Sequence, residues 1–323
     1  MPVHKPKPIA PKPQPVAPVA PIPAKPQAPV RPVAPPKPVD LVDPKVANDD
    51  HTKQPDDYAY QKNTRGAALF GPNGVQALDV KQGYIGDCFL AASMAAVAGA
   101  RPDVIKNAMT DNHNGTYTVR FYEVDWNGAK KVHKETVDGD LPWDSMSNGP
   151  AYARSAEVVG GKSHMELWPS VLEKAYAAWK GSYDTVGHGG ISGDVMEALT
   201  GERSRQMATK APGEADPLWL KMKTAAAAHK PMTAGSGGEE DPRYKDPKAG
   251  VYGWHAYTVM GVEEKKNGDK TERWVTMRNP WGKRRRNSDA AAVGDTTNDT
   301  AGGVFQLPWA EFRRLYDDVT ING

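Results

Sequence analysis

Residues 82–98 decide the fold, because two glycines and a polar pair lead there into an alanine-rich apolar run: Gln82-Gly-Tyr-Ile-Gly-Asp-Cys-Phe-Leu-Ala-Ala-Ser-Met-Ala-Ala-Val-Ala98. A run that is apolar on all sides predicts a buried helix, here beginning at Cys88. Cys88 is the only cysteine of the 323 residues, so no internal disulfide can occupy its thiol. The unpaired N–H groups of a helix N-terminus favour a thiolate. Cys88 is therefore a candidate nucleophile.

Gln82 supplies an amide donor on the glycine-containing loop before Cys88. Together with the backbone N–H of Cys88, it would provide two donors for a developing oxyanion. A lone cysteine on an apolar helix is more often a small buried side chain than a nucleophile. The other sequence motifs decide between these two interpretations.

Four blocks of the sequence resemble, in order, the signature blocks of the calpain family of cysteine proteases. These blocks are Gln82–Ala92, Glu166–Tyr176, Gly253–Val259 and Arg278–Gly282. The resemblance extends over about residues 66–323, and Phe89 stands where the family usually has Trp. It implies an α+β, papain-like fold of two lobes, with the nucleophile helix in a helical lobe and His and Asn in a β-rich lobe.

The domain organisation follows from composition and from this resemblance. Residues 1–38 hold 15 of the 29 prolines, and no aromatic residue occurs before Tyr58. We expect residues 1–57 to form a disordered, basic, proline-rich tail, with 39–57 polar and unstructured. Residues 58–201 would form the first protease lobe and 202–323 the second. The tail is interpreted as a spacer, and binding to a proline-recognising domain is the less favoured alternative.

Charge and hydropathy exclude several classes of partner. Residues 1–39 contain six Lys or Arg and no acid, so the remaining chain has 35 basic and 39 acidic groups. This balance argues against a nucleic-acid-binding core. No apolar run reaches the length of a membrane span, and no signal-peptide core is recognisable. A cytoplasmic location is favoured, and the expected partners are protein or peptide substrates.

Periodicity and turn signals predict the main elements around the candidate residues. The predicted strands are Thr116–Trp126, Lys131–Val137, Trp254–Val262 and Trp274–Asn279, and the predicted helices are 166–179, Leu218–His229 and Trp309–Leu315. An Asn267-Gly268 turn would bring His255 and Asn279 to the same end of two antiparallel strands. The register is one residue from placing them on the same face, and a longer loop or a bulge would correct it. Residues 235–253 form a polar loop where the family has a gating loop.

His255 and Asn279 complete the chemistry that Cys88 requires. A thiol at its ordinary pKa is mostly protonated at neutral pH, so His255 would hold the proton as imidazolium. Asn279 would orient the imidazole, and Trp281 would cover the bond between them. The thiolate would then hydrolyse peptide bonds through a thioester, with the oxyanion held by Gln82 and the Cys88 N–H.

Two other functions use the same residues. A Cys-His acyl transferase or amidase would need no further motif, although the sequence shows no distinctive site for an acceptor amine. A non-enzymatic interaction protein on a protease fold would normally lack the nucleophile or the base, and both are present here.

The resemblance also implies calcium, because each lobe of the family's protease core carries one calcium site. In the first lobe the matching ligands are the carbonyls of Pro72 and Gly74 with the carboxylates of Asp79 and Glu166. Hard oxygen ligands of this kind suit calcium. In the second lobe the matching positions fall on the basic run 283–286 and on Gly303, so that site is expected to be lost. We therefore expect one calcium ion at most.

Overall fold

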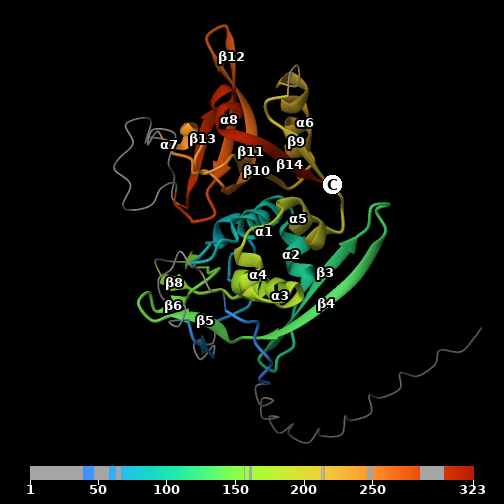
Figure 1. Cartoon of the computed structure of the whole chain (residues 1–323), viewed down its shortest axis with the longest axis vertical. Helices are drawn as coiled ribbons and strands as arrows, with labels where there is room; N and C mark the ends of the chain where they lie inside the picture. Colours follow the sequence, from blue (N-terminus) through green and yellow to red (C-terminus); the bar gives the residue numbers. More distant parts are fainter. Residues whose placement is uncertain are drawn as a thin grey trace, which may run out of the picture. The chain divides into compact units, whose positions relative to one another are not determined.

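The computed structural model describes residues 39–46, 58–62, 67–155, 157–159, 162–211, 213, 215–245, 250–283 and 302–323. Helices and antiparallel sheets follow one another along this part of the chain, which confirms the predicted α+β class (Figure 1). The proline-rich residues 1–38 and the arginines at 284–286 lie outside the described residues.

The elements before Gly201 include the nucleophile helix and a long hairpin. They are β1 (Tyr60–Gln61), the 3-10 turn η1 (Ala77–Asp79), α1 (Cys88–Ala100), α2 (Pro102–Ala108), β2 (Met109–Asp111), β3 (Thr116–Val124), β4 (Lys130–Asp138), β5 (Leu141–Asp144), β6 (Gly149–Pro150), β7 (Glu157–Val159), β8 (Lys162–His164), α3 (Trp168–Lys180), α4 (Tyr183–Gly187) and α5 (Ser192–Thr200). The structure confirms the predicted strands Thr116–Trp126 and Lys131–Val137 and the predicted helix 166–179. Each end lies within two residues of its predicted position.

Helix α1 is the centre of this group, as its composition predicts. All of its residues from Phe89 to Ala98 are buried. It packs against α5 and α2 and also against β10 and β11, which come much later in the chain. A helix covered on every side needs small apolar residues, because bulky ones would hold the neighbouring elements apart. The alanine-rich sequence thus allows elements from both halves of the chain to meet at Cys88.

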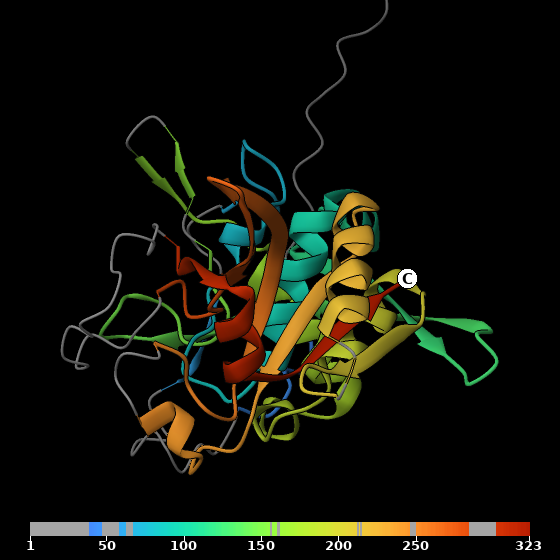
Figure 2. The ribbon, with the colours of Figure 1, turned by 90° about the horizontal axis from the view of Figure 1, so that it is seen from above.

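The elements after Gly201 build a six-stranded sheet with the order β13-β12-β11-β10-β14-β9. They are β9 (Ser204–Ala208), α6 (Ala215–Ala227), β10 (Met232–Ser236), α7 (Pro242–Lys245), β11 (Ala256–Asn267), β12 (Lys270–Arg278), β13 (Val304–Pro308), α8 (Trp309–Leu315) and β14 (Tyr316–Asn322). Helices α6 and α8 pack on this sheet, and Figure 2 shows both beside the β11–β12 hairpin. The predicted helix at 309–315 is confirmed at both ends. The segment 235–253, predicted as a polar loop, contains regular secondary structure, since it includes the end of β10 and all of α7.

Buried side chains form two hydrophobic clusters in the described chain. One runs from Leu69 to Leu199 and includes Ala256, and the other runs from Leu218 to Ile321. The proposed lobe boundary between residues 201 and 202 lies between these clusters, and the division into two lobes remains a prediction.

The expectation of an unstructured segment is wrong for residues 39–46. Asp43 forms an ion pair with the buried Lys174 at 2.5 Å, and Leu41 donates its N–H to Asp138 at 2.7 Å. Lys45 accepts a backbone hydrogen bond from Tyr183 at 3.0 Å. Polar composition did not predict this, because the partners are buried charges more than 90 residues away in sequence.

Within the described residues, no single helix is long and apolar enough to cross a membrane.

Candidate active site

Cys88 is the first residue of α1, and its side chain is partly accessible. Burial is the main influence on the thiol and raises its pKa to about 11, and the nearby Asp87 carboxylate raises it further. The backbone N–H groups of Ala256, Phe89 and Cys88 act in the opposite direction. The N–H groups at the start of the helix thus act in the expected direction, toward the thiolate, and desolvation opposes them more strongly. A base must take the proton.

His255 and Asn279 lie in direct contact. The distance between His255 Nε2 and Asn279 Oδ1 is 2.9 Å, and both side chains are buried. Because an amide oxygen only accepts, Nε2 is the donor in this bond. The other ring nitrogen, Nδ1, is thereby left to accept a proton from another group.

A β-bulge places these two side chains on one face. The hairpin turn pairs Asn267 with Lys270, and the register of β11 against β12 shifts between Val259 and Gly261. After the shift Thr258 pairs with Arg278, so the same register sets Asn279 opposite Tyr257, on the face that also carries His255. Without the bulge the two side chains would point to opposite faces. The hairpin is confirmed, but its two-residue turn is Gly268-Asp269 and not the predicted Asn267-Gly268. The bulge is the correction that the sequence left undetermined.

Aromatic rings cover the His255–Asn279 bond. The Trp281 ring lies 4.4 Å from the His255 ring between centroids, and the backbone N–H of Trp281 donates to Asn279 Oδ1 at 3.1 Å. Tyr257 packs edge-on to His255 at 4.8 Å. Such a cover limits competition from water and strengthens the hydrogen bond.

Cys88 meets this strand at its first residue. The backbone N–H of Ala256, directly after His255, faces the thiol. One turn further along the helix, the Thr258 hydroxyl donates to the Ala92 carbonyl at 2.8 Å. The structure therefore brings the beginnings of α1 and β11 together.

Gln82 is buried near these residues but faces another partner. Its Nε2 donates to the Ile85 carbonyl at 2.7 Å, and its Oε1 has no hydrogen-bond partner among the residues that the structure describes. Its backbone N–H donates to the Pro280 carbonyl at 2.9 Å, which ties the loop before Cys88 to the segment after Asn279.

Two buried acids beside Cys88 were not singled out from the sequence. Burial raises the pKa of Asp87 to about 6, and the neighbouring side chains of Glu173 and Gln82 act in the opposite direction. Burial and Asp87 raise the pKa of Glu173 well above its ordinary value, while both Glu173 oxygens face the Ala153 N–H. The raised pKa of each carboxyl has the same main cause, because burial disfavours the charged form. The signal available in the sequence was Glu173, a charged residue between apolar positions of helix 166–179.

Arg278 also lacked a predicted role. Its side chain is fully buried, and Nη2 donates to the Val80 carbonyl at 2.5 Å. Burial lowers its pKa to about 10, and Asp79 acts in the opposite direction. Arg278 thus links the strand before Asn279 to the segment before Gln82.

The two carboxylates among the predicted calcium ligands accept backbone N–H groups at either end of the segment 71–76, which contains Pro72 and Gly74. Glu166 accepts the N–H of Gly71 at 2.8 Å and the hydroxyl of Ser155 at 2.9 Å. Asp79 accepts the N–H of Gln76 at 2.6 Å and the indole N–H of Trp168 at 3.2 Å. Calcium prefers oxygen ligands of this kind, and both carboxylates also accept local hydrogen bonds.

At Gly303, where the family's second calcium site would lie, the backbone has a positive φ of 78°. The Gly303 carbonyl accepts the backbone N–H of Asn279 at 3.0 Å.

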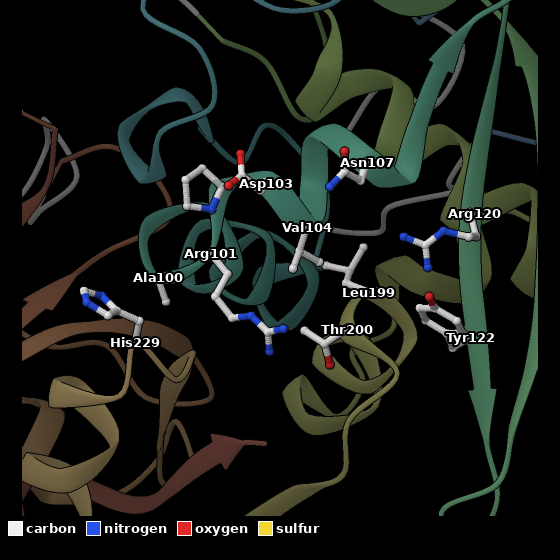
Figure 3. Close-up of a pocket in the computed structure, with 11 residues that line it drawn as sticks. Ala100, Arg101, Asp103, Val104, Asn107, Arg120, Tyr122, Leu199, Thr200 and His229 are labelled. Atoms are coloured by element: carbon white, nitrogen blue, oxygen red, sulfur yellow. The ribbon is translucent and has the colours of Figure 1, made fainter. Parts of the chain in front are cut away.

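A separate cavity of about 540 Å³ lies beside α2, β3 and the end of α5. Figure 3 shows the guanidinium groups of Arg101 and Arg120 approaching it from opposite sides. Arg101 is paired with Glu202 at 2.9 Å, and Arg120 stacks on Tyr122. None of the predicted site residues lines this cavity.

Comparison with known proteins gives a family match over most of the chain. A family profile described as "Calpain family cysteine protease" matches residues 46–321. The rice (Oryza sativa subsp. japonica) calpain-type cysteine protease ADL1 is 30% identical over 71% of this chain and 10% of its own length. Human calpain-9 is 26% identical over 77% of this chain and 36% of its own, and rat calpain-13 is 24% identical over 71% and 32%. The chain thus spans about a tenth to a third of the length of these relatives.

Proposed function

The chain belongs to the calpain family of cysteine proteases, and on that premise we propose that it is an endopeptidase with Cys88, His255 and Asn279 as its catalytic triad. The observation that carries the proposal is the covered 2.9 Å hydrogen bond between His255 and Asn279, on the strand whose Ala256 N–H faces Cys88. The proposed substrates are proteins or peptides.

The reaction begins with transfer of the Cys88 proton to Nδ1 of His255. Because the pKa of the thiol is raised to about 11, the thiol ionises at neutral pH only by this transfer. Asn279 accepts from Nε2 and fixes the ring, and Trp281 keeps water from that bond. The thiolate attacks the peptide carbonyl and forms a tetrahedral oxyanion.

The first donor to the oxyanion is the Cys88 backbone N–H, one of the free N–H groups of the first helical turn. Gln82 is the second, after its amide rotates away from the Ile85 carbonyl. His255 then protonates the leaving amine and the C–N bond breaks, which leaves a thioester. Water, deprotonated by His255, attacks the thioester and releases the acid and the free thiol.

Product analysis separates hydrolysis from acyl transfer. Casein is incubated with the protein and an excess of a primary amine, and the new peptide termini are examined by mass spectrometry. We expect free carboxyl termini, because no distinctive acceptor-amine site was recognised in the sequence. Amine-capped termini as the main product would favour the transferase, and intact casein together with an unreactive Cys88 would favour a non-enzymatic role.

We propose further that calcium binds the first-lobe turn through Asp79, Glu166 and the carbonyls of Pro72 and Gly74. Calcium should raise the melting temperature and give a one-site binding isotherm, since a ligand that binds only the folded state stabilises it. Asp79→Asn with Glu166→Gln should remove both effects. The exposed acid Glu239→Gln serves as control and should change neither. Two bound ions by titration calorimetry would contradict this proposal, as would no binding heat together with full activity in chelator.

A further inference from the structure

Trp254, the residue before His255, combines two unfavourable features. Its backbone φ is +47°, a left-handed conformation that is a genuine outlier for a bulky side chain. Its side chain is also 78% exposed. Such strain persists where surrounding contacts impose it, most often at functional sites.

The surrounding contacts do impose this conformation. The Trp254 N–H donates to the Gly237 carbonyl at 2.6 Å, and the next N–H, of His255, donates to the Ser236 hydroxyl at 3.0 Å. The same hydroxyl donates to the Tyr252 carbonyl at 2.6 Å. Hydrogen bonds thus hold residues 252–255 against the end of β10.

The Trp254 indole lies next to Gly238, which has no side chain. A Cβ placed on Gly238 would lie 3.8 Å from Trp254 Nε1, so glycine there leaves this edge of the ring uncovered. Gly253 fits against Glu239 and Tyr244 so closely that any Cβ would clash with the Glu239 backbone at 2.7 Å. The loop therefore presents the indole beside His255 and does not bury it.

We propose that Trp254 is a specificity-determining residue that packs against an apolar or aromatic side chain of the peptide substrate, on the leaving-amine side of the cleaved bond. This inference rests on the proposed function. His255 must reach the leaving nitrogen to protonate it, and the exposed indole one residue before His255 is available to the part of the peptide that follows the cleaved bond. A large rigid aromatic ring gains much contact area there at a small entropy cost.

The test compares two peptides that differ only in the two residues after the cleaved bond, which are Leu-Leu or Gly-Gly. We expect the wild type to cleave the Leu-Leu peptide with a kcat/KM about ten-fold higher or more. Trp254→Gly should bring this ratio close to one, and Trp254→Phe should retain most of it. Trp126→Gly, which removes another exposed tryptophan (85%), is the matched control and should keep the wild-type ratio.

Thermal unfolding gives a second, independent measurement. Glycine adopts φ +47° without strain, so Trp254→Gly should raise the melting temperature by a few degrees. A tryptophan kept for packing would give a lower melting temperature instead.

An unchanged Leu-Leu preference in Trp254→Gly, or a wild type without this preference, overturns the role of Trp254 alone. A wild type that cleaves neither these peptides nor casein overturns the protease function as well.

Discussion

Cys88→Ala and His255→Ala are each expected to lower peptide hydrolysis about 10⁴-fold or more, to the background of the assay. Cys88 would supply the bond to the substrate, and no second cysteine exists to replace it. His255 would supply the base that the thiol requires. The measurement is steady-state cleavage of casein or of a fluorogenic peptide. His188→Ala is the matched control, because His188 is an exposed histidine whose ring is hydrogen-bonded to the Asp184 carbonyl. Full activity in Cys88→Ala would refute the mechanism.

The pH dependence of Cys88 alkylation by iodoacetamide tests the base separately from turnover. Burial raises the pKa of the thiol to about 11, so the thiolate of an isolated Cys88 appears only as the pH rises toward that value. His255→Ala should therefore react slowly at pH 7 and progressively faster above pH 9. The wild type should react already near neutral pH, because the imidazole holds the proton. Identical profiles for the two proteins would show that His255 is not the base.

Lys174→Met is expected to lower the free energy of unfolding by about 3–5 kcal/mol, because it leaves buried carboxylates without their cation. Lys174 is 1% exposed and contacts Asp138 at 2.6 Å, Asp43 at 2.5 Å and the Asp140 carbonyl at 2.7 Å. Chemical denaturation measures the change. Lys223→Met is the control, since its ion pair with Glu264 is equally short at 2.6 Å but its side chain is 52% exposed. It should cost at most about 1 kcal/mol. Equal losses in both variants would show that burial does not matter here.

Two truncations test which part of the N-terminal segment contributes to thermal stability. Removal of residues 1–38 should leave the melting temperature nearly unchanged, because that composition offers little apolar surface to bury. Removal of residues 1–46 should lower it, since Asp43 and the backbone bonds of Leu41 and Lys45 are lost as well. If both truncations behave like the full chain, the contacts of residues 39–46 contribute nothing to stability.

Local patterns were sufficient for most elements of the fold. The alanine-rich run after Cys88 has no polar face, so only a helix buried on all sides accommodates it. Asn114-Gly115 and Asn127-Gly128 bracket the alternating segment that forms β3. The second turn predicts that the next strand pairs with it, because side chains in a strand alternate with a period of two and an Asn-Gly turn reverses the chain. The composition of the segment 39–46 did not predict its contacts, because its partners Asp138, Lys174 and Tyr183 are distant in sequence.

The sequence by itself determined the chemistry of the candidate site: one thiol at a helix start, and a histidine and an asparagine at one end of a hairpin. Only the tertiary structure decided that His255 and Asn279 share a face, because that depends on a bulge between Val259 and Gly261, and a shift of one residue reverses every side chain. It also decided the direction in which the pKa values of Cys88 and Asp87 shift. A pKa depends on burial and on neighbouring charges, and these exist only once the helix, the strand and the loops have packed together.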